Sequence, residues 1–146
     1  MIKTEKEYRE CCEKIEKDQA VIDLQRAELE KMKLTEEEMK RALDPLLSFN
    51  QQLIDEVRWY ERVRRRDFGT INDLTSIGRV LIALRIANGI SQKELADRLA
   101  VNVSQVSRDE SNEYHGISLD RAQRILDALG ERLITAVQER QASVAF

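Results

Sequence analysis

Two helix-start signals follow each other closely in the stretch SQKELADRLAVNVSQVSRDE, from Ser91 to Glu110. Ser91 with Glu94 forms a capping box, in which the serine side chain accepts from the N3 amide and the glutamate accepts from the cap amide. Asn102 with Gln105 repeats the same pattern. The pattern predicts two short helices here, each starting directly after its cap residue and joined by a tight turn.

The second of these helices, about residues 103–110, presents small, hydrogen-bonding and cationic side chains to the outside. Val106 is its one plain core anchor. Gln and Arg make bidentate contacts with base edges, and an apolar methyl group can touch thymine. A face of this kind suits the edges of base pairs. The candidates for base reading on it are Val103, Ser104, Gln105 and Arg108.

The stretch resembles the helix-turn-helix of the Xre/Cro-type family, which includes phage repressors. The family pattern has a Gln opening the first helix, an Ala in its middle and a small residue at the turn, and these fall on Gln92, Ala96 and Ala100. Its spaced aliphatic positions fall on Leu95, Leu99, Val101 and Val106. The resemblance implies that Gln92 clamps a DNA phosphate at the start of the first helix. It also implies that the second helix enters the major groove with the four candidate base-reading residues.

Two positions depart from the family pattern. Ala100 stands where Gly is most frequent, and a small residue suffices there if the backbone stays out of the left-handed region. Asp109 stands at a late core position that is usually Ile or Leu. Because a lone buried Asp is costly, we expect Asp109 to be exposed, capping or paired with an arginine.

One dense basic run lies between Arg58 and Arg66. Phosphate contact beside the DNA-binding helices is one interpretation, and it would steepen the salt dependence of binding. A solvated helix end, whose cations complement the helix dipole, is the other. The net charge of −3 does not decide between them, because the local distribution of charge determines the field that DNA meets. The residues to which we assign DNA backbone contacts are Gln92, Lys93, Ser107 and Arg66.

The composition favours a mainly α fold, with 35% charged residues, 5% aromatic residues, one Pro and five Gly. From Thr4 to about Met32 an apolar stripe recurs every seven residues, and Leu46 to Tyr60 keep a three-four spacing. These segments predict a helical hairpin or small bundle with little core of its own, so dimerisation or partner docking is implied. Asp44-Pro45 resembles a helix restart, and a continuous kinked helix is the alternative.

The remaining segments complete a four- to five-helix domain. One helix should end at Asn88-Gly89 and another should run from Ser118 to Gly130, flanking the motif. Residues 132–137, RLITAV, suit either a strand that pairs across a dimer or a continuation of helix. Met1-Ile2 and Ala142–Phe146 are expected to fray. The expected domains are a hairpin over 1–67 for dimerisation or partner binding, a DNA-binding domain over 68–140 and a tail over 141–146.

Nothing in the sequence indicates catalysis, a metal or a cofactor. His115 is the single histidine, and the adjacent Cys11 and Cys12 are far from it and form no metal or redox motif. The glycines are scattered and form no phosphate-binding loop. No run reaches the length of a membrane span and the start lacks the apolar core of a signal peptide, so we expect a cytoplasmic protein with no membrane partner.

These observations predict a sequence-specific DNA-binding regulator, in the first place a repressor, that acts as a homodimer on a double-stranded operator. The opening MIKTEKEY ahead of a helical segment is similar to some HigA-type antitoxins. An antitoxin that neutralises a toxin protein and autoregulates its operon is therefore the first alternative. A helical interaction scaffold is the second.

Overall fold

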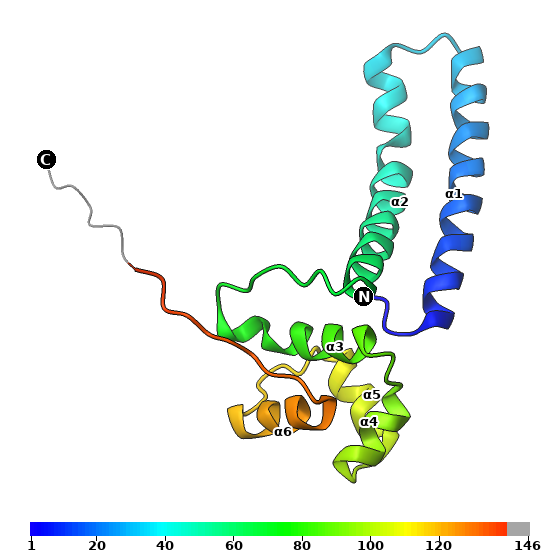
Figure 1. Cartoon of the computed structure of the whole chain (residues 1–146). Coiled ribbons are helices and arrows are strands. Elements are labelled where there is room, and N and C mark those ends of the chain that lie inside the picture. The colour runs from blue at the N-terminus through cyan, green and yellow to red at the C-terminus, as the bar shows by residue number, and fades with distance from the viewer. Residues whose placement is uncertain (140–146) are drawn as a thin grey trace, which may run out of the picture.

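The computed structural model describes residues 1–139, in which six α-helices and one short 3-10 helix supply the regular structure (Figure 1). The mainly α class is therefore confirmed. The elements are α1 (Glu5–Lys31), α2 (Glu36–Arg64), η1 (Leu74–Ser76), α3 (Ile77–Ala87), α4 (Gln92–Leu99), α5 (Val103–Ser111) and α6 (Leu119–Leu129). The helices α1 and α2 form an antiparallel hairpin that projects away from the four helices of the C-terminal part (Figure 1).

The hairpin forms where the seven-residue spacing predicts it. Thr4 caps α1 by accepting from the amide of Glu7, and Thr35 opens α2 through a complete capping box. The helix α1 buries Cys11 and Ile22. The predicted stripe stops short of its last member, because Met32 follows the helix end and is 66% exposed.

The helix α2 runs without a break through Pro45, so the predicted restart is wrong and the continuous alternative holds. Proline removes one N–H and leaves the carbonyl of Arg41 without its helical partner. Both residues are exposed, so water can satisfy that carbonyl. The helix tolerates Pro45 because it lies on the solvent side.

The base of the hairpin shares one apolar core with the C-terminal helices. Tyr60 and Val63 of α2 are buried in the same cluster as Leu81 and Ile82 of α3. Ile2 belongs to this cluster and is only 3% exposed, so the prediction that it frays is wrong. Burial of its apolar side chain at the joint outweighs the entropy of a free end. The division of the chain after residue 67 stays a prediction.

The chain beyond α6 takes neither of the conformations predicted for it. Gly130 ends α6 in the left-handed region with φ 69°, and residues 131–139 contain no helix and no strand. Ile134 and Val137 are 97% and 98% exposed, since nothing in residues 1–139 covers them. A strand needs a partner, and residues 1–139 of a single copy provide none. The predicted tail over 141–146, with the fraying of Ala142–Phe146, lies outside the described residues.

No single helix within residues 1–139 is both long and apolar enough to cross a membrane. The pair Leu74–Ala87 and Gln92–Leu99 reaches the required length and composition only together, and it is bent by 109°.

Candidate nucleic-acid interface

The first helix of the motif begins where its capping box predicts. The hydroxyl of Ser91 accepts from the amide of Glu94 at 3.0 Å, and the Ser91 amide donates to the Glu94 carboxylate at 2.8 Å. The helix α4 then starts at Gln92, and Leu95 and Ala96 are buried. The inner face of α4 is therefore fixed by local signals and by the core.

The turn after α4 corrects one expectation. Ala100 has φ 53° and ψ 42°, which is the left-handed region that the sequence interpretation assumed it would avoid. The amide of Val101 donates to the carbonyl of Ala96 at 3.0 Å, and that of Ala100 donates to Asp97 at 3.2 Å. These bonds satisfy the last carbonyls of α4 and require a left-handed residue at the helix end.

Replacing Ala100 with glycine should therefore stabilise the protein by roughly 0.5–1 kcal/mol, because glycine relieves the left-handed strain and loses part of the gain to its more flexible unfolded chain. The free energy of unfolding in urea measures the change. Ala42→Gly, at an exposed position inside α2, is the matched control and should destabilise by about 0.5–1 kcal/mol. Equal losses for both variants would contradict the left-handed assignment.

The start of α5 bears out the cap and only half of the second capping box. The side chain of Asn102 accepts from the amide of Ser104 at 2.9 Å and from its hydroxyl at 3.0 Å. In the described part of the chain, Gln105 returns no side-chain bond to the cap. The Asn102 side chain therefore bonds to Ser104, the second residue of the helix, and not to the third. The Gln105 side chain is half-buried on the flank of α5.

A buried ion pair that the sequence interpretation missed holds the inner face of α5. Glu110 is 0% exposed and Arg85 of α3 is 3% exposed. Two hydrogen bonds hold the pair: Arg85 Nε donates to Glu110 Oε1, and Arg85 Nη2 donates to Glu110 Oε2 at 2.7 Å. Arg85 also donates to the carbonyls of Ile90 at 2.9 Å and Lys3 at 3.1 Å. Burial of both charges is tolerated because the guanidinium and the carboxylate neutralise each other and because other guanidinium N–H groups donate to backbone carbonyls.

A sequence signal for this pair exists. Arg85 stands inside the apolar run from Leu81 to Ile86, and Glu110 lies one turn after Val106 on the same face. The neighbouring acid behaves as expected, because Asp109 is half-buried and pairs with Arg121 of α6.

The outer face of α5 carries the residues predicted to read bases. Ser104 and Arg108 are one turn apart on the side opposite Val106, and both are exposed. Arg108 Nε donates to the carbonyl of Ser104 at 3.3 Å, while within residues 1–139 its two Nη atoms form no bond. Val103 is 43% exposed on one flank, and Gln105 is half-buried on the other. The face is polar and cationic, and its centre keeps the two terminal guanidinium nitrogens of Arg108 available for a ligand.

The four residues predicted to contact the DNA backbone do not share one environment. Lys93 is exposed, and Gln92 and Ser107 are half-buried. Gln92 Nε2 donates to Glu110 Oε2 at 2.7 Å, which uses one of its two amide N–H groups and leaves the other available. Their role in DNA binding stays a prediction.

Arg66, the fourth, lies away from the motif helices at the joint between the hairpin and α6. It donates to Glu131 at 2.7 Å and to Asn88 at 3.2 Å, and its guanidinium lies over the ring of Phe68. The pKa of Glu131 is lowered, first by the hydrogen bond from Arg66 and then by one from the Asn88 side chain at 2.8 Å. These contacts favour a structural role for Arg66.

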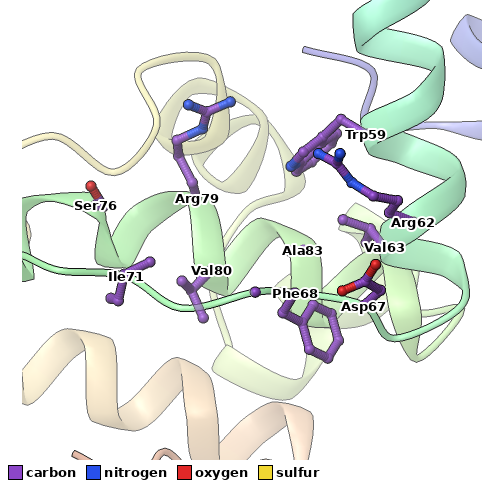
Figure 2. A pocket seen from close by; sticks show the side chains of 11 residues that line it. Trp59, Arg62, Val63, Asp67, Phe68, Ile71, Ser76, Arg79, Val80 and Ala83 are labelled. Carbon is purple, nitrogen blue, oxygen red and sulfur yellow. The ribbon is translucent and has the colours of Figure 1, made fainter.

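A hollow of about 510 Å³ lies beside the joint, between the end of α2, the linker and α3 (Figure 2). Trp59 and Arg62 come from α2, and Arg79 and Val80 from α3 (Figure 2). Arg62 therefore lies on a different side of α2 from Arg64, which bonds to Glu5 at 3.2 Å.

Comparison with known proteins agrees with this geometry. Residues 81–134 match a family model described as helix-turn-helix, a span that runs from α3 through the motif to just beyond α6. This part of the chain is therefore a DNA-binding helix-turn-helix domain of the Xre/Cro-like type. No curated protein and no solved structure matches the chain.

Proposed function

We propose that the protein is a sequence-specific transcriptional repressor that reads the major groove with α5. The exposed face of α5, with Ser104 and Arg108 at its centre, is the observation that carries the proposal. Such a face recognises base edges because the guanidinium can donate two parallel bonds to guanine. The buried bond of Glu110 to Arg85 holds the opposite face, so α5 is presented on a rigid support.

The proposed regulator acts as a homodimer, with α5 helices of two copies reading half-sites about 34 Å apart. Large apolar side chains that are exposed in one copy support self-association. They occur on the hairpin, at Val21, Leu24 and Phe49, and on the extended stretch, at Ile134 and Val137. In this proposal residues 1–67 supply the dimer or partner contacts and residues 68–140 bind DNA.

The test begins with selection of bound duplexes from a random pool by the purified protein. Arg108→Ala should then lose roughly 1–3 kcal/mol on the selected sequence and relax the preference at one position. Arg124→Ala, an exposed arginine of α6, is the matched control and should keep both affinity and preference. An unchanged preference for Arg108→Ala would show that α5 does not read bases as assigned.

An antitoxin is the second candidate. The exposed apolar side chains of the hairpin favour it, since they suit contact with a protein partner as well as with a second copy. Co-purification of one small protein in fixed stoichiometry, lost when Leu24 and Phe49 are replaced by serine, would favour this candidate over a repressor without a partner.

A further inference from the structure

A second hollow, of about 470 Å³, lies where the N-terminal arm, residues 1–4, and the end of α2 meet the start of α4. The hairpin side contributes Lys3, Glu5 and Arg64, and the motif side contributes Gln92 and Lys93. The two predicted phosphate ligands at the start of α4 therefore face residues that lie outside the segment matched by the helix-turn-helix family.

The charges around this hollow are mostly positive. Lys3, Arg64 and Lys93 supply three cations, and within residues 1–139 neither lysine side chain forms an ion pair. Arg64 is 53% exposed and donates through Nη1 to Glu5, which leaves its other N–H groups available. Arg85 also lines the hollow, but Glu110 neutralises it.

The arm is held in this position by the core. Ile2 is buried, and the carbonyl of Lys3 accepts from Arg85 Nη2 at 3.1 Å. The Lys3 side chain therefore starts from a fixed backbone beside α4, so little backbone entropy is lost when it meets a ligand.

We infer that the hairpin takes part in DNA binding, with Lys3 and Arg64 contacting the same stretch of duplex backbone that Gln92 and Lys93 clamp. The inference rests on the proposed function. Duplex DNA is the occupant that fits, because its phosphates follow one another closely along the backbone. When one phosphate is held at Gln92 and Lys93, neighbouring phosphates of the same duplex reach the hairpin side of the hollow. The contacts add affinity and carry no sequence preference.

The experiment measures the salt dependence of binding to a duplex of random sequence and to the selected operator. Each phosphate contact contributes about 0.9 to the slope of log K against log salt concentration, so Lys3→Ala with Arg64→Ala should lower the slope by roughly 2 on both duplexes. The ratio of the two affinities should stay unchanged. Lys6→Ala with Arg62→Ala is the matched control, because Lys6 pairs with Glu10 and Arg62 faces the hollow in Figure 2, and it should keep the wild-type slope.

A gain-of-function variant separates DNA contact from a structural role of the Arg64–Glu5 pair. Glu5→Gln removes the one acid that lines the hollow on the hairpin side, and it should tighten binding to the random duplex several-fold at low salt. A structural role alone predicts no gain. Equal slopes for the test and control pairs would overturn the inference while leaving the repressor intact, whereas a wild-type protein that selects no sequence would overturn the proposed function itself.

Discussion

Replacing Glu110 with alanine is expected to destabilise the protein by about 3–5 kcal/mol, because the change leaves the buried guanidinium of Arg85 without a counter-charge. The same change removes the acceptor of the Gln92 side chain. A loss of this size is a large share of the whole stability of a small domain. Thermal or urea unfolding of the variant measures it.

Two controls test the cause of that loss. Arg79→Ala removes an exposed arginine from the same helix as Arg85 and should change the stability by less than about 0.5 kcal/mol. Arg85→Met combined with Glu110→Leu should cost much less than the sum of Arg85→Ala and Glu110→Ala, since no uncompensated charge remains. Additive losses would mean that the two side chains act independently.

Gly78→Ala is expected to have the second large effect, a loss of about 3 kcal/mol at the upper end of the overpacking range. A methyl group built on Gly78 would lie 1.9 Å from the carbonyl oxygen of Glu113 and 2.8 Å from its carbon, so backbone must move. That backbone belongs to the turn after α5, where Glu113 and the buried Tyr114 already have positive φ values of 50° and 53°. Equilibrium unfolding measures the cost.

Gly69→Ala provides the comparison for this prediction. Gly69 has φ 65° and an added methyl group would meet nothing within 4 Å, so only the left-handed strain of about 1–2 kcal/mol applies. If Gly78→Ala cost no more than Gly69→Ala, the turn after α5 would be free to move away from α3.

Local signals predicted the helix starts well. Ser91, Asn102 and Ser118 all cap the helices that follow them, because a capping bond depends on residues within one turn. The exposed face of α5 was predictable for the same reason, as the helical period alone separates Ser104 and Arg108 from Val106. The fold class and the position of the motif follow from these signals.

Features that depend on distant residues were missed. Glutamate is rarely buried, so the sequence alone favours a surface position for Glu110. It is buried because Arg85, in another helix, pairs with it. Ile2 is buried only because α2 and α3 meet beside it. The continuous course of α2 through Pro45 depends on which side of the helix faces solvent, and the residues around Pro45 do not encode that alone.

If the proposed partner binds at the far end of the hairpin, the unbroken course of α2 sets the distance between that partner and the helix-turn-helix domain. With 29 residues at about 1.5 Å each, α2 is roughly 43 Å long, which exceeds the rise of about 34 Å for one turn of duplex. Figure 1 shows the turn between α1 and α2 at the end far from α3 to α6. In the proposed function, a protein attached at that turn would therefore be held at the far end of a continuous helical hairpin, roughly 43 Å from the joint with the DNA-binding domain.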